Sequence, residues 1–171
     1  PEQGRRYATT LAVEARPESG YPRSIRAGTE FVVVGRVAQG LVLTEAFYWD
    51  LNDETRAWTK RFRAKKDKIP SMLTVGVYSS TLHYLKAVQA AGTDEPKAVM
   101  AKMREIPVND VMTKNGKLRE DGRLERDMYL FQVKTPAESK SKDDIYKLVA
   151  TVPGNEAYRP MKDGKCPFVK N

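Results

Sequence analysis

Apolar residues recur with two different periods in the first half of the chain. From Val37 to Phe47 they form a nearly continuous, β-branched run, which is typical of a strand buried on both faces of a parallel sheet. Asn52 suits a helix N-cap. Around it, apolar positions follow one another at intervals of four, three and four residues, which predicts one buried helix face. That stripe comprises Leu51, Thr55, Trp58 and Phe62.

Two further helices are predicted downstream. The first follows Gly76, is expected to begin at about Ser79, and ends at Gly92, because glycine accepts the left-handed conformation that often closes a helix. The second carries Pro96 in its first turn, where the missing amide hydrogen costs nothing, and ends at Pro107.

Beyond Pro107 the period shortens to two. Asn115-Gly116 predicts a hairpin turn, because both residue types tolerate positive φ. Alternating side chains from Met128 to Val133 predict a strand with both faces covered, and the run from Ile145 to Val152 predicts another. Strands that alternate with helices and end in a late hairpin indicate an α/β fold with a mainly parallel sheet.

Residues 1–37 read differently from residues 38–171. They are rich in Arg, Pro, Ser and Gly, and their one convincing element is a strand through Phe31-Val32-Val33-Val34. Two explanations stay open for this atypical segment: genuine divergence, and a reading-frame or assembly error in the parent sequence. We therefore treat 1–37 and 38–171 as separate parts.

The net charge of +8 raises the possibility of a nucleic-acid partner. Seven basic residues and one acidic residue lie between Arg56 and Lys68. Asp53 and Glu54 open the same predicted helix, and this charge order complements a helix dipole. The chain has no zinc-finger spacing and no aromatic RNA-binding motif. A solvated helix end is the favoured interpretation, with no nucleic-acid partner.

Catalytic and metal chemistry find little support in the sequence. It contains no nucleophile elbow, no phosphate-binding loop, no dinucleotide-binding glycines and no zinc-protease motif. His83 is the single histidine and Cys166 the single cysteine, so neither a histidine-rich metal site nor an internal disulfide is available within these residues. No run of about 18 apolar residues predicts a membrane span. We expect no catalytic residues, no metal and no cofactor.

Aromatic residues are the stronger candidates for a site. Phe47-Tyr48-Trp49-Asp50 follows the carboxyl end of a predicted strand, where ligands bind in open α/β sheets. Tyr and Trp combine a large flat surface with a polar group, which suits an organic solute. Tyr78 is expected just before a helix N-terminus, whose free amides attract anions. Tyr48, Trp49 and Tyr78 are therefore the candidate ligand-binding residues, with simple packing as the alternative, above all for Phe47.

The order of three segments between Ala38 and Pro136 resembles a known family. These segments are AQGLVLTEAFYWDLNDETRAWTKRF, VGVYSSTLHYLKAVQAAGTDEPKAVMAKMREI and DMYLFQVKTP. They resemble the C-terminal portion of a periplasmic substrate-binding protein of ABC transporters, from the branched-chain amino-acid and amide (leucine-binding-like) family. FYWD and KTPAES look most like a subgroup associated with aromatic or other organic acids.

This resemblance implies a fold, a part in that fold and a function. The fold is the type I periplasmic-binding-protein fold, which has two α/β lobes with mainly parallel sheets and a hinge of three chain crossovers. The chain would be its incomplete C-terminal portion, with residues from Ala38 to about Lys66 in the second lobe and Val75 to about Pro107 in the first.

The implied function is solute capture for an ABC importer in the periplasm. The lobes would close on a branched-chain amino acid, an amide or an aromatic acid, and the protein would deliver it to the permease membrane subunits. The resemblance implies no enzyme activity, no cofactor and no direct insertion into the membrane. The alternative with the same fold is the ligand-sensing domain of a receptor or regulator.

Overall fold

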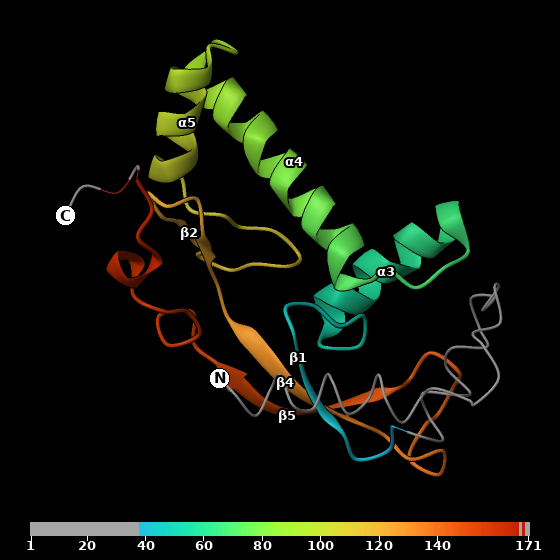
Figure 1. Ribbon diagram of the computed structural model, residues 1–171. Helices are drawn as coiled ribbons and strands as arrows, with labels where there is room; N and C mark the ends of the chain where they lie inside the picture. The colour runs from blue at the N-terminus through green and yellow to red at the C-terminus, as the bar shows by residue number, and fades with distance from the viewer. Residues whose placement is uncertain (1–37, 168, 170–171) are drawn as a thin grey trace, which may run out of the picture. The chain divides into compact units, whose positions relative to one another are not determined.

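The computed structural model describes residues 38–167 and residue 169 (Figure 1). These residues combine helices and strands, in agreement with the predicted α/β class; the strand expected at residues 31–34 lies outside them. The elements in chain order are β1 (Val42–Glu45), α3 (Asp53–Lys66), α4 (Met72–Ala91), α5 (Pro96–Glu105), β2 (Lys117–Leu118), β3 (Leu124–Glu125), β4 (Met128–Val133), β5 (Tyr146–Val152) and the 3-10 turn η1 (Met161–Gly164).

The strands form two sheets. A three-stranded sheet has the order β1-β4-β5, and β2 pairs with β3 in an antiparallel hairpin. The bounds of β4 are those predicted, and β5 begins one residue later than expected. The first strand is shorter than predicted, and burial on both of its faces is a wrong expectation, since Val42 is 52% exposed.

The predicted hairpin turn at Asn115-Gly116 is also wrong. Gly116 forms a bridge with Val108, and the hairpin turn lies at residues 119–123, between β2 and β3. Side chains fold the preceding loop: Asp110 Oδ1 accepts the amide hydrogens of Met112 and Thr113, at 2.7 and 3.0 Å. Such local bonds let a short polar side chain replace a backbone turn.

The helix α3 begins as the sequence predicts. Asn52 is its N-cap, and its side chain accepts the Thr55 amide hydrogen at 2.9 Å. The Thr55 hydroxyl in turn accepts the Asn52 amide hydrogen at 3.0 Å, which completes a capping box. Thr55 and Trp58 are buried, so the predicted apolar stripe does face the core.

The helix α4 begins seven residues before the predicted start. Ser71 is its N-cap and accepts the Thr74 amide hydrogen, so Gly76 lies inside the helix. One helical glycine costs about 1 kcal/mol relative to alanine, which the burial of Val75 next to it offsets. The predicted end is confirmed, because Gly92 caps α4 with a φ of 67°.

The two faces of α4 are unusual in composition. Its buried side chains are small or polar, apart from one valine, whereas several large apolar side chains are exposed. The buried residues are Val75, Ser79, His83 and Ala87, and the exposed apolar ones include Leu73, Val77, Tyr84 and Leu85. No helix in the described residues is both long and apolar enough to cross a membrane.

The chain divides into two compact units. One contains Gln132–Lys147 with the described residues up to Leu43, and the other contains Thr44–Phe131 with the residues from Leu148 onward. The boundaries fall inside β1, β4 and β5, so the chain passes between the units three times. The expected boundary near Lys66 is wrong, because α3 and α4 lie in the same unit.

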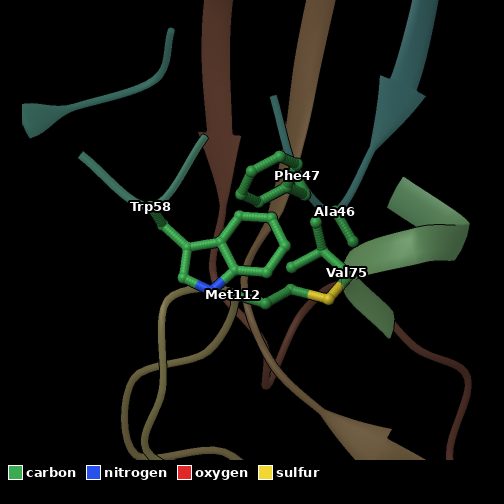
Figure 2. Packing of buried hydrophobic residues seen from close by; sticks show 5 residues of the cluster. All are labelled: Ala46, Phe47, Trp58, Val75 and Met112. Carbon is green, nitrogen blue, oxygen red and sulfur yellow. The ribbon is translucent and has the colours of Figure 1, made fainter. Parts of the chain in front are cut away.

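A shared core explains why α3 and α4 stay together. Figure 2 shows the side chains of Phe47, Trp58, Val75 and Met112 gathered with Ala46 in one cluster. Phe47 comes from the loop after β1, Trp58 from α3, Val75 from α4 and Met112 from the loop before β2. These four segments therefore fold as one body.

Two buried threonine hydroxyl groups lack a hydrogen-bond partner within the described residues. Thr59 in α3 and Thr113 in the loop before β2 are each 3% exposed.

Candidate ligand-binding site

Ring contacts divide eight aromatic residues of the larger unit into two groups. In the first group, Trp58 contacts Phe47, Phe62 and Tyr78, with ring centroids at 6.3, 5.4 and 5.2 Å. The Trp58 and Phe62 rings are stacked, with an interplanar angle of 15°.

The second group forms around Tyr48. Its ring lies 5.9 Å from Trp49 and 5.4 Å from Phe131, and Phe131 lies 6.1 Å from Tyr129. Tyr129 and Phe131 are two residues apart in β4 and therefore share a face of that strand. This group joins the segment after β1 to the middle of β4.

Two of the predicted site residues lie where the sequence places them. Tyr48 and Trp49 follow the end of β1, in the segment between this strand and α3. Tyr48 is 8% exposed, so most of its ring serves packing, whereas Trp49 is only partly buried. Trp49 thus offers more surface to a solute than Tyr48 does.

The third predicted residue has a different setting. Tyr78 lies inside α4 and not before a helix N-terminus, so the expected free amides are absent there. The next residue, Ser79, is buried and donates its hydroxyl hydrogen to Asp110 Oδ2 at 2.6 Å. Tyr78 packs against Trp58 and is 40% exposed, which places it in the first aromatic group.

Phe47 confirms the packing alternative. It is 3% exposed and belongs to the core cluster. Sequence reasoning missed Tyr129 and Phe131 as neighbours of the candidate site. Their signal was the alternation in β4, but only the pairing of β4 next to β1 brings them near Tyr48.

Charged groups beside the aromatic residues are paired with one another. Arg56 donates to Asp50 at 2.8 Å and to Asp53 at 2.7 Å. These hydrogen bonds, the one to Asp53 more than the one to Asp50, raise the pKa of Arg56. Burial raises the pKa of Glu45 at the end of β1. Because Arg56 already binds two carboxylates, the aromatic surfaces are the better candidates for holding a solute.

Metal binding and acid–base chemistry are not evident at this site. The described residues contain no group of three or more His, Cys, Asp and Glu side chains that could hold a metal. His83 is buried, and its Nε2 lies 2.8 Å from the carbonyl oxygen of Met103, which ties α4 to the end of α5. Cys166 is a free, partly buried thiol.

Comparison with known families shows which family the chain belongs to. The family described as periplasmic binding protein matches residues 24–142, which is more than half of the chain. The chain belongs to this family. The match includes part of the atypical segment 1–37. The family is one of binding proteins and not of enzymes.

Two solved structures are similar in sequence as well as in fold. A periplasmic binding protein from Burkholderia mallei is 36% identical, with a TM-score of 0.79 over 96% of this chain and 44% of that one. A branched-chain amino acid ABC transporter periplasmic ligand-binding protein from Burkholderia xenovorans is 41% identical, with a TM-score of 0.77 over 84% of this chain and 39% of that one. A search of curated proteins gave no match.

A more distant structure extends the likeness in fold alone. The leucine binding protein of Thermotoga maritima is 17% identical, with a TM-score of 0.58 over 75% of this chain and 35% of that one. The described residues therefore have the type I periplasmic-binding-protein fold in part. The chain spans about two fifths of the length of the two Burkholderia proteins.

Proposed function

We propose that this chain is part of the solute-binding component of an ABC importer. The protein would work in the periplasm, capture a small organic solute and deliver it to the permease. The observation that carries this proposal is the 41% identity, over 84% of the chain, to a protein described as a branched-chain amino acid ABC transporter periplasmic ligand-binding protein. The proposed solute is a branched-chain amino acid, an amide or an aromatic acid.

The proposed contacts are Tyr48, Trp49 and Tyr78. Trp49 and Tyr78 support this role because each combines ring contacts that hold it in place with surface that stays open. A preorganised ring loses little side-chain entropy when it binds an apolar group. Tyr48 contributes mainly as the ring between Trp49 and Phe131.

The proposed mechanism is closure of two lobes on the solute. Three passages of the chain between its compact units support a hinge at β1, β4 and β5. A solute that contacts both lobes stabilises the closed state, because it binds that state more tightly than the open one. Discharge to the permease then requires reopening.

Calorimetry on the whole protein that contains this chain tests the solute class. The panel comprises leucine, valine, an aliphatic amide and benzoate. We expect at least one of them to bind with a dissociation constant in the micromolar range and to raise the melting temperature. If none of the four binds or shifts the melting temperature, the proposed solute classes are wrong.

Three variants test the proposed contacts. Trp49→Ala and Tyr78→Ala should each weaken binding of the best solute by about 1–3 kcal/mol, because each removes a packed aromatic surface. Tyr84→Ala is the matched control, since Tyr84 is also an exposed aromatic residue of α4 but makes none of the ring contacts above. Unchanged affinity in both test variants, with folding intact, would remove these residues from the site.

A further inference from the structure

Positive charge is concentrated at one end of α3 and in the residues just after it. Residues 60–68 contain six cations and one acid, so these nine residues carry a net charge of +5 out of +8 for the whole chain. All six cationic side chains are exposed. We call this surface the basic end of α3; it consists of Lys60, Arg61, Arg63, Lys65, Lys66 and Lys68.

Within the described part of the chain, most of this charge has no internal partner. The ion pairs there involve other cations, and none includes Lys60, Arg61 or a lysine of residues 65–68. The acids at the start of the helix are already bound, Asp53 by Arg56 and Glu54 by Lys114. Lys60, Arg61 and the three lysines of residues 65–68 are therefore not compensated by the acids at the start of their own helix.

The helix dipole explains only part of this arrangement. Cations in the last turn, such as Lys65 and Lys66, stabilise a helix, but the effect fades within one turn. Lys60 and Arg61 lie further back. Spacings of three and four residues, as from Lys60 to Arg63 and from Arg61 to Lys65, bring like charges together, which destabilises a helix. A partner outside the described residues would offset this repulsion.

The distribution of the cations indicates what kind of partner fits. With about 3.6 residues per turn, successive residues such as Lys60 and Arg61 lie about 100° apart around α3, so the cations are spread around the helix and form no single pocket. Four of the six cations are lysines, which act as hydrated point charges and not as planar forks. The one large apolar residue among residues 60–68 is Phe62, which packs against the core. Such a surface suits a diffuse anionic layer.

We propose that the basic end of α3 adsorbs to the anionic phospholipid headgroups of the membrane without inserting. Clusters of four to eight Lys and Arg residues on an amphipathic helix are the usual pattern for this kind of binding. The exposed surface there offers no aromatic or leucine side chain that could enter the acyl region. The physiological meaning rests on the proposed function, since adsorption would concentrate the binding protein beside the membrane-embedded permease.

Vesicle co-sedimentation of the whole protein tests the proposal. Two vesicle types are compared, pure phosphatidylcholine and a mixture containing about one third phosphatidylglycerol, at low salt and at about 0.15 M salt. The test variant is K60Q/R61Q/K65Q/K66Q. The control variant K97Q/K117Q/K142Q/K162Q removes four exposed cations elsewhere.

We expect the wild type to bind the anionic vesicles and not the neutral ones. The test variant should bind them at least about tenfold more weakly, and the control variant about as well as the wild type. Solute affinity should be unchanged in both, so a failure here is distinguishable from a failure of the proposed function. Equal binding by both variants, equal binding to neutral vesicles, or tighter binding to duplex DNA than to vesicles at 0.15 M salt would each overturn the proposal.

Discussion

Replacement of Trp58 by alanine is the sharpest test of how this chain holds itself together. The Trp58 side chain is 9% exposed and contacts three aromatic rings and the cluster around Val75. Among the described residues, it is the member of the buried hydrophobic cluster that α3 contributes. Removing it leaves a cavity that rigid neighbouring rings cannot easily fill.

The magnitude follows from the area that is lost. A tryptophan buries on the order of 200 Å², which at about 25 cal/mol per Å² corresponds to about 5 kcal/mol. The small exposed fraction reduces this only slightly, and partial collapse of the cavity brings the expected loss to about 3–5 kcal/mol. Because a folded protein has only about 5–15 kcal/mol in total, Trp58→Ala should come close to unfolding the body formed by α3 and α4.

Urea unfolding followed by circular dichroism measures this loss in the whole protein. Trp58→Phe keeps one ring and should cost only about 1–2 kcal/mol, so that the two variants form a graded pair. Trp49→Phe is the control, because Trp49 is only partly buried and packs against the core cluster without being one of its buried members. A loss below about 1 kcal/mol for Trp58→Ala would show that this core is not what joins α3 to α4.

Three further predictions concern other parts of the chain. Gly76→Ala should stabilise α4 by about 0.5–1 kcal/mol, since an added Cβ meets nothing within 4 Å. Gly154→Ala should destabilise the protein, because its Cβ would lie 2.9 Å from the backbone of Arg126. The midpoint of urea unfolding measures both effects. Glu138 accepts several hydrogen bonds, and the one from Lys147 has the largest effect; together they lower the pKa of Glu138 from 4.5 to about 2. A carboxylate whose pKa is lowered in the native state stabilises the fold above pH 4.5, and this stabilisation is lost as the pH falls toward 2. Glu138→Gln should therefore flatten the plot of melting temperature against pH over this range. An unchanged plot would contradict the assignment. Finally, residues 1–171 alone should melt broadly and without a solute effect, because α4 exposes large apolar residues; a sharp, cooperative transition of a monomer would refute this.

Local signals in the sequence predicted much of the secondary structure. Asn52 as a cap, Gly92 as a helix end and Pro96 in a first turn all act through bonds within a few residues, and each is confirmed. The bounds of β4 followed from strict alternation. Such features need no knowledge of which segments meet in space.

Errors arose where tertiary contacts override local preference. Gly76 suggested a break, but α4 runs through it because Ser71 caps the helix and Val75 is buried. Asn115-Gly116 suggested a hairpin turn, but the side chains of Asn109 and Asp110 fold the loop before it. Apolar residues in β1 suggested full burial, although a sequence pattern cannot show what covers Val42.

The candidate site was predictable in kind but not in arrangement. Position after a strand was enough to select Tyr48 and Trp49. The ring contacts that place Tyr78 with Trp58, and Tyr48 with Phe131, depend on pairs 20 and 83 residues apart in the sequence. No local pattern records such distances, so only the fold could divide the aromatic residues into two groups.

The buried hydroxyls of Thr59 and Thr113 bear on how this protein was shaped by selection. A hydroxyl that is removed from water without a partner costs free energy that valine, with nearly the same shape, would not lose. On the contacts within the described residues, these two positions leave room for stabilising substitutions. This is the expected state of a protein held just above the stability that its function demands, where selection removes only those changes that fall below the threshold.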